Sequence, residues 1–161
     1  MELLLSKLNS YLPESSISKI RQAYTFASTA HRNQSRLSGE PYIEHPVQTA
    51  LLLADLKLDV STVMAGLLHD VMEDCQVPFT TLEAEFGREV AKLVDGVTRL
   101  AKLDSEPIGQ SDKTPSHITN PTRAENLQKM LISMAEDVRV VLIKLADRLH
   151  NMNTLKYLPE D

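Results

Sequence analysis

Four chemically active side chains lie within one short segment near the middle of the chain: His69, Asp70, Glu73 and Asp74. If the apolar helix before them continues, residues four apart stack on one face, so His69 lies above Glu73 and Asp70 above Asp74. Carboxylates this close repel one another, and burying them without a counter-charge is costly. A divalent cation would relieve both problems. The alternative, a solvated helix end, fits poorly because acids near a helix C-terminus oppose the helix dipole.

A second polar pattern lies near the end of the chain. Asp147, Asn151 and Thr154 recur at positions i, i+4 and i+7, which places them on one face of a helix. The run directly before them is apolar nearly all round, which predicts a central helix. A buried Asp147 needs a partner. The sequence leaves two choices open: an arginine, either Arg148 or Arg123, or the metal ion inferred above.

Two further residues come from the first third of the chain. His45 precedes a proline at the start of a predicted helix, where its imidazole can point inward, although capping or surface roles are commoner for such a histidine. Arg36 lies in a polar loop and is a solvated cation by default. The possible ligands are then two histidines and two carboxylates, namely His45, His69, Asp70 and Asp147. Mixed nitrogen and oxygen ligands with open positions suit Mn²⁺, Fe²⁺ or Zn²⁺ rather than Ca²⁺.

Composition narrows the class of protein. A chain of 161 residues with 42% apolar and 24% charged residues suits one soluble globular domain. The net charge of −5 argues against nonspecific nucleic-acid binding, which needs clustered Lys and Arg. Cys75 is the only cysteine, which excludes an intrachain disulfide and favours a reducing cytoplasm. No apolar run is long enough for a membrane helix, and no glycine-rich phosphate loop is present.

Helical periodicity dominates and strand alternation is nearly absent, so we expect one all-α domain over residues 1–161. Serines at positions 15, 16 and 18 are possible caps of the second helix, Asp59 or Ser61 of the fourth, and Thr80 with Glu83 forms a capping box for the fifth. Residues 32–41 and 104–121 are predicted to be loops, and the second is expected to be long and mobile. The predicted helices span residues 2–11, 15–31, 42–56, 59–74, 80–87, 88–98, 123–135 and 138–155.

The spacing of His45, the His69-Asp70 pair and Asp147 resembles the H…HD…D signature of the HD-domain phosphohydrolase superfamily. One branch is closer. From about residue 23 to 159 the chain is similar to the hydrolase domain of RelA/SpoT-type enzymes. These enzymes remove the 3′-pyrophosphate from the alarmones ppGpp and pppGpp in the stringent response, commonly with Mn²⁺. The segments that carry the resemblance are residues 38–46, 66–74, 93–98 and 143–152.

The resemblance implies an HD-type helical bundle and a role for each matched residue. The two histidines and two aspartates would hold the metal. Glu73 and Asp74 would be the catalytic acidic pair that activates and positions water. Guanosine tetra- or pentaphosphate would be the ligand, and the implied substrate-binding residues are Arg36, Ser38, Arg148, Asn151 and Thr154.

Two departures from the family pattern bear on substrate affinity. Many members have a basic residue where this chain has Leu37, and many have Arg where it has Asn153. Long members also continue into a synthetase domain that this chain lacks, so it is expected to be an excised domain or a small stand-alone hydrolase. Two other functions are compatible with these residues: an HD phosphohydrolase for a different nucleotide, and a non-catalytic alarmone sensor. Intact Glu73 and Asp74 favour an active hydrolase.

Overall fold

Helices form the regular secondary structure of the computed structural model, which describes residues 1–36, 39–105 and 137–154. The all-α prediction is confirmed for these residues, where an isolated antiparallel bridge joins Ser35 and Pro41. No helix in this part of the chain has both the length and the apolar character that a bilayer crossing requires. The helices are α1 (Glu2–Leu8), α2 (Glu14–Ala30), α3 (Glu44–Asp55), α4 (Val60–Leu68), α5 (Phe79–Phe86), α6 (Arg88–Ser105) and α8 (Val138–Asn153).

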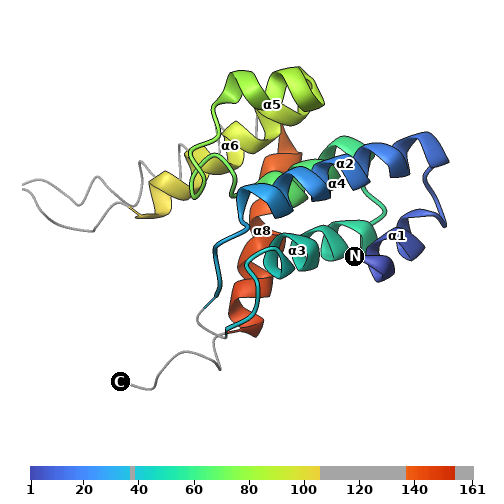
Figure 1. Cartoon of the computed structure of the whole chain (residues 1–161), viewed down its shortest axis with the longest axis horizontal. Helices are drawn as coiled ribbons and strands as arrows, with labels where there is room; N and C mark the ends of the chain where they lie inside the picture. Colours follow the sequence, from blue (N-terminus) through green and yellow to red (C-terminus); the bar gives the residue numbers. More distant parts are fainter. Residues whose placement is uncertain (37–38, 106–136, 155–161) are drawn as a thin grey trace, which may run out of the picture.

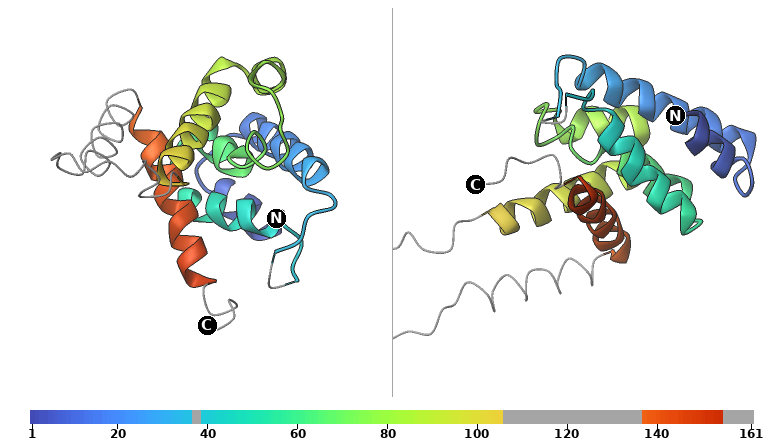
Figure 2. Two further views of the ribbon diagram at one scale, coloured as in Figure 1. Left: turned by 90° about the vertical axis from the view of Figure 1, so that its left-hand side faces the viewer. Right: turned by 90° about the horizontal axis from the view of Figure 1, so that it is seen from below.

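The central helix of the bundle is α4. It packs against α2, α3, α6 and α8, and in Figure 1 it lies alongside α2, with α3 below them and α8 crossing behind. Figure 2 shows from two further sides that α8 runs across the other helices. Every residue of α4 from Thr62 to Leu68 is buried, as expected for a helix that is apolar all round. The residues that follow α4 therefore begin in the interior.

Within the described residues, the helix α8 packs against α3, α4 and α6. The predicted central position of this helix stays a prediction, because residues 106–136 and 155–161 lie outside the described part of the chain. The covered face of α8 carries the buried residues Val140, Ile143, Ala146 and Asp147, while Val138, Leu145, Leu149 and Met152 are exposed.

Side-chain caps fix the starts of two helices. At α4 the Asp59 carboxylate accepts hydrogen bonds from the Thr62 backbone N–H at 3.1 Å and from the Thr62 hydroxyl at 2.6 Å, which confirms Asp59 as the cap. At α8 the Asp137 carboxylate accepts from the Arg139 N–H at 3.0 Å. The two other helices for which the sequence predicts side-chain caps follow prolines instead, Pro13 before α2 and Pro78 before α5.

Those prolines explain two wrong boundaries. Since proline is favoured where the chain enters a helix, α2 begins at Glu14 rather than at the serines that follow it. In the same way α5 begins at Phe79, so Thr80 lies inside the first turn and the predicted capping box with Glu83 is wrong. Neither helix has a side-chain cap hydrogen bond.

The structure also changes the ends of two helices. The predicted continuation through Asp74 is wrong: α4 stops at Leu68, and residues 69–74 form successive turns. Within these turns the Asp74 N–H donates a backbone hydrogen bond to the Asp70 carbonyl at 2.8 Å, with the i to i−4 spacing of a helix. The helix α6 runs to Ser105, beyond the predicted end and into the expected 104–121 loop. The rest of that loop and the helix expected at 123–135 lie outside the described residues.

Gly66 lets α4 approach α3 closely. A Cβ atom at this position would lie 2.5 Å from Cδ1 of Leu53 and 3.7 Å from Cα of Ala50, both on α3. His45 is in the first turn of α3 and His69 directly follows α4. The close helix contact therefore helps to bring the two histidines together, with ring centroids 5.1 Å apart.

Candidate metal centre

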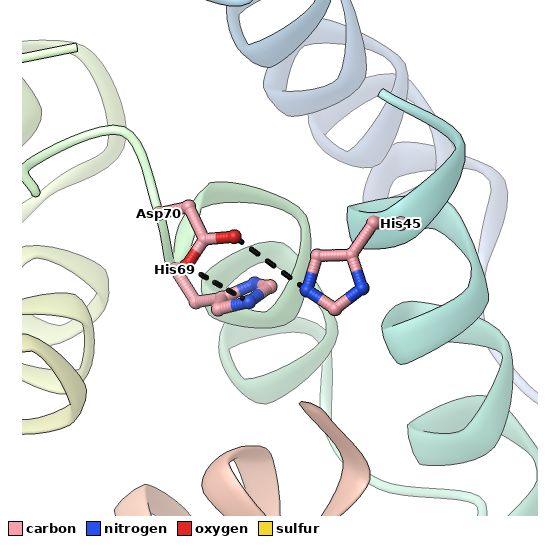
Figure 3. A group of neighbouring side chains, drawn as sticks. All are labelled: His45, His69 and Asp70. Carbon is pink, nitrogen blue, oxygen red and sulfur yellow. Dashed lines mark ion pairs between the residues drawn. The ribbon is translucent and has the colours of Figure 1, made fainter. Parts of the chain in front are cut away.

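Three elements deliver four potential ligands to one place. His45 comes from the first turn of α3, His69 and Asp70 from the turn after α4, and Asp147 from the covered face of α8. Figure 3 shows His45, His69 and Asp70 pointing toward one another. His45, His69 and Asp147 are buried, with 2–4% of their surface exposed, and Asp70 is partly buried. The structure thus assembles the two-histidine, two-carboxylate set that the sequence predicts.

The distances within this set are short. Nε2 of His69 lies 3.1 Å from Oδ1 of Asp70, and Nε2 of His45 lies 3.5 Å from Oδ2 of Asp70. Oδ1 of Asp147 lies 3.1 Å from Nε2 of His45 and 3.8 Å from Nε2 of His69. Ligand atoms of His45, His69 and Asp70 all lie within 4.8 Å of one another. Asp147 is outside that tightest group and joins it through the two imidazoles.

A divalent cation fits these residues because of one orphaned atom. Nδ1 of His69 donates its proton to the Gly66 carbonyl at 2.8 Å, which leaves a lone pair on Nε2. That Nε2 is buried without a hydrogen-bond partner and faces the carboxylates of Asp70 and Asp147. A lone pair opposite two carboxylates is repulsive unless a proton or a metal ion lies between them. An imidazole whose other nitrogen is held by a carbonyl is typical of a metal ligand.

The electrostatics of His69 lead to the same conclusion. Burial lowers the pKa of His69, but the negative charges of Asp70 and Asp147 outweigh burial and raise it to about 10. Without a metal the carboxylates therefore hold a proton on this ring. Metal ligands must be deprotonated, so a cation would take the place of that proton.

The two aspartates are ionised. Burial works to raise the pKa of Asp70, but the neighbouring His69 more than offsets it and the pKa falls to about 2. For Asp147, burial is likewise outweighed by its interactions with His45 and His69, which hold its pKa well below the usual range. Lys144 adds a contact of 2.9 Å to Oδ2 of Asp147. Both carboxylates are thus available as anionic ligands.

Asn151 and Lys144 are the neighbours of Asp147 on its own helix. Asn151, four residues on, donates its amide to Oδ1 of Asp147 at 2.7 Å, as the i, i+4 spacing indicates. The cation beside the carboxylate is Lys144, which the sequence reasoning did not single out. Arg148 is exposed on α8, and Arg123 lies outside the described residues.

The two catalytic candidates differ in their surroundings. The Tyr42 hydroxyl lies 2.6 Å from Oδ2 of Asp74 and 2.8 Å from Oδ2 of Asp70, so it connects the acid to a potential metal ligand. Burial, followed by the charge of Asp70, raises the pKa of Tyr42 far above its usual range, so the phenol stays protonated. Glu73 is exposed, and the ion pairs and hydrogen bonds described among these groups do not include it. The predicted stacking of His69 above Glu73 is therefore not formed.

Sequence reasoning missed Tyr42, although its place three residues before His45 was a signal. The ring of Tyr42 stacks on His31, with centroids 4.6 Å apart and planes 20° apart, which fixes its direction. The chain reaches this position through the loop that also carries Arg36. The backbone of that loop is closed by the Tyr42 N–H, which donates to the Gln34 carbonyl at 3.0 Å.

A cavity of about 300 Å³ opens beside the centre and contains some of the predicted substrate-binding residues. Arg36, Thr154 and His45 line it, and the Arg36 guanidinium donates to Oδ1 of Asn151 at 2.7 Å. Ser38 and the neighbouring Leu37 lie outside the described residues. His150, also missed from sequence, lines the cavity, and burial together with His45 and Arg36 lowers its pKa to about 4. Its position three residues after Asp147 was the signal.

A larger cavity, of about 830 Å³, lies between α5, α6 and the start of α8. None of the predicted site residues lines it. Most of the charges around it are paired: Arg139 contacts Asp137 at 2.7 Å and Glu89 at 2.8 Å, and Arg99 contacts Asp95 at 3.1 Å. Among its described lining residues, the cavity therefore lacks the converging histidines and carboxylates of the smaller site.

Comparison with known proteins agrees with the geometry. The chain is 49% identical over 160 residues to the bifunctional (p)ppGpp synthase/hydrolase SpoT of Escherichia coli. The aligned region covers 99% of this chain and 21% of that protein. It is 48% identical over 151 residues to a guanosine-3′,5′-bis(diphosphate) 3′-pyrophosphohydrolase of Vibrio cholerae, covering 94% of this chain and 20% of that protein. The chain thus spans about a fifth of the length of these relatives.

A solved structure is also similar. It is described as a metazoan ortholog of SpoT that hydrolyzes ppGpp, and it superposes with a TM-score of 0.62 at 29% identity, over 90% of this chain and 72% of the other. Residues 23–161 match the family described as HD domain. This match covers most of the sequence and includes the four converging ligands. The chain therefore belongs to the HD domain family.

Proposed function

We propose that this domain is a metal-dependent phosphohydrolase that removes the 3′-pyrophosphate of ppGpp and pppGpp, giving GDP or GTP and pyrophosphate. The observation that carries the proposal is the buried, unpartnered Nε2 of His69, aimed at two carboxylates beside a cavity that holds an arginine. The names of the relatives supply the substrate class, since the hydrolase from Vibrio cholerae and the metazoan ortholog both act on this alarmone by their descriptions.

The ligands of the metal would be His45, His69, Asp70 and Asp147. Nitrogen and carboxylate oxygen donors suit Mn²⁺, and we propose Mn²⁺ as the ion used. When bound, such an ion supplies a lowered pKa for water and draws charge from the phosphoryl group. The nitrogen atoms of the two histidines already lie 3.1–3.5 Å from aspartate oxygens, so little rearrangement would be needed to receive the ion.

Asp74 and Glu73 would manage the protons. Hydrolysis forms a bond from water oxygen to the phosphorus attached to O3′ and breaks the P–O3′ bond, so a proton must leave the water and reach the 3′-oxygen. Asp74 is held at the centre by Tyr42, so we assign it the proton of the attacking water. Glu73 is exposed and would orient the water or protonate the leaving oxygen once substrate closes over it.

The cavity beside the centre would receive the nucleotide. Arg36 is already held there by Asn151, so its guanidinium is placed for a phosphate or a base before substrate binds. Thr154 lines the same cavity, and Arg148 and Ser38 are proposed to contribute from α8 and from the loop after Arg36. Leu37 and Asn153 stand where many relatives have basic residues, which predicts weaker substrate affinity than theirs rather than different chemistry.

The proposal is tested by the release of pyrophosphate from ppGpp, measured with Mn²⁺ and with a chelator. We expect metal-dependent release that yields GDP and is abolished in Asp74→Asn. Tight ppGpp binding without release would favour an alarmone sensor, and neither release nor binding would favour a different nucleotide. A cytoplasmic location and a synthetase domain in a longer protein stay predictions, which fractionation and sequencing of the whole gene would test.

A further inference from the structure

His150 lies against the face of His45 that points away from the carboxylates. The two Nδ1 atoms are 2.7 Å apart, and the rings are tilted by 39° with centroids 4.9 Å apart. His150 is half-buried on α8, three residues after Asp147. At 2.7 Å, two ring nitrogens must share one proton, because two lone pairs or two N–H groups would repel one another.

Arg36 decides which of the two nitrogens carries that proton. Its NH1 lies 3.3 Å from the same Nδ1 of His150. A guanidinium can only donate, so Nδ1 of His150 has to present a lone pair. His150 then carries its proton on Nε2, and the proton between the rings belongs to Nδ1 of His45. The lone pair of His45 is thereby placed on Nε2, which faces Asp147 at 3.1 Å and Asp70 at 3.5 Å.

The opposite arrangement conflicts with Arg36 and would also close the metal-facing nitrogen of His45. If Nδ1 of His150 carried the proton, it would face the Arg36 guanidinium donor to donor. His45 would then hold its proton on Nε2 and donate to Asp147, which blocks that nitrogen as a ligand. A neutral His150 with a lone pair on Nδ1 accepts the proton of His45 at 2.7 Å, and the same lone pair attracts the Arg36 guanidinium at the longer distance of 3.3 Å. The arrangement that suits Arg36 therefore leaves the lone pair of His45 opposite Asp147 and Asp70, where a cation would bridge them as at His69.

We propose that His150 is a positioning residue that fixes the tautomer of His45 for metal binding, in the way that the Gly66 carbonyl does for His69. The inference rests on the metal site of the proposed function. It also links the nucleotide cavity to the metal, since Arg36 and His45 use one acceptor atom. Residues that orient metal-bound histidines typically change metal affinity by roughly 10–100-fold when replaced.

Mn²⁺ affinity, measured by titration calorimetry without nucleotide, tests the inference independently of turnover. In His150→Leu the acceptor is lost at similar volume, and we expect Mn²⁺ to bind roughly 10–100-fold more weakly. In His150→Asn the amide oxygen occupies the place of Nδ1, so affinity should return to within a few-fold of the wild type. His150→Gln places its amide beyond that point and should behave like the leucine variant. Leu149→Asn, at an exposed neighbour on α8, is the matched control and should bind as the wild type does.

The outcomes separate this inference from the function on which it rests. If wild-type protein binds no Mn²⁺, the proposed metal site fails. If wild type binds and His150→Leu binds equally well, the site stands and the role of His150 is wrong. Should His150→Leu not fold, His150→Asn against His150→Gln gives the same decision, and equal affinity in those two would overturn the inference. Circular dichroism of the metal-free variants checks the fold.

A spectroscopic readout tests the proton directly. In Zn²⁺-loaded protein labelled with ¹⁵N-histidine, we expect His45 to show a protonated Nδ1 and a metal-bound Nε2. In His150→Leu the proton on Nδ1 of His45 loses its acceptor, so its signal should broaden by exchange with water while that of His69 stays sharp. A His45 signal that does not change would overturn the proposal.

Discussion

The two histidines of the centre are equally buried but are oriented by different means. Nδ1 of His69 is bound to the carbonyl of Gly66, part of the backbone of the central helix α4. Nδ1 of His45 is bound to His150, a half-buried side chain that lines the cavity beside the centre. The first ligand is therefore set by the fold itself. The second depends on side chains that a substrate or a substitution can disturb, so the centre has a rigid half and an adjustable half.

The strongest way to break this comparison is to remove the carboxylate that both halves share. The Asp70 carboxylate lies within 3.5 Å of Nε2 of His45 and of Nε2 of His69, so Asp70→Ala should abolish Mn²⁺ binding and hydrolysis together. Elemental analysis of the purified protein and pyrophosphate release would measure the two. Full metal content at full rate in this variant would contradict the assignment of the centre.

Replacing the acidic pair should affect chemistry and leave both halves of the metal site intact. We expect Asp74→Asn and Glu73→Gln each to lower kcat by roughly 10²–10⁴-fold, as is typical for general acid–base groups, at unchanged Mn²⁺ affinity. Steady-state kinetics and metal titration would be run on the same samples. A variant that loses metal as well as rate would instead belong with the ligands.

Tyr42 joins the acidic pair to the rigid half. Tyr42→Phe keeps the ring stacked on His31 but removes the hydroxyl between Asp70 and Asp74. The loss of a hydrogen bond to a charged group corresponds to about a 10–100-fold lower kcat, with KM nearly constant. Kinetics with ppGpp would measure the split, and Tyr24→Phe, on α2, serves as a control that should leave kcat unchanged.

The pH dependence of metal-free stability should distinguish the two histidines by sign. The folded-state pKa of His69 is raised from 6.5 to about 10, so its contribution is present below pH 6.5 and is lost as pH rises through 10. Burial lowers the pKa of His45, so its contribution is present above pH 6.5 and is lost at lower pH. On the alkaline side we expect a decrease on the order of 5 kcal/mol in the free energy of unfolding.

Urea unfolding of the protein in chelator, from pH 5 to 10, would measure this prediction. His69→Gln should remove the alkaline decrease and His45→Gln the acidic one. Saturating Zn²⁺ should also flatten the alkaline side, because the cation takes the place of the proton on His69. An unchanged alkaline decrease in His69→Gln would assign it to another group.

The smallest expected effect comes from the helix contact that supports the rigid half. In Gly66→Ala the new Cβ meets only the end of the Leu53 side chain at 2.5 Å, and that end can shift. We therefore expect a loss of about 1 kcal/mol in stability, at the low end for overpacking. Urea unfolding would measure it. The double variant Gly66→Ala with Leu53→Val should recover part of the loss, and no recovery would mean that the backbone rather than Leu53 resists the change.

What the sequence determined by itself is the chemistry of the centre. The adjacency of His69 and Asp70 and the i, i+4 spacing of Asp147 and Asn151 are local properties, and the structure keeps both. The all-α class is equally local, because it follows from the period of the apolar residues. Local reasoning failed where two signals competed, as at Thr80, where a proline two residues earlier starts the helix.

Only the tertiary structure decided how the ligands are oriented. The contact between His45 and His150 joins residues 105 positions apart, and that between Tyr42 and Asp74 joins residues 32 apart. No periodicity reports such contacts, because they depend on how α3, α4 and α8 cross. The end of α4 at Leu68 is of the same kind: the turn after it directs His69 and Asp70 together at one point, whereas a continued helix would separate adjacent side chains by about 100°.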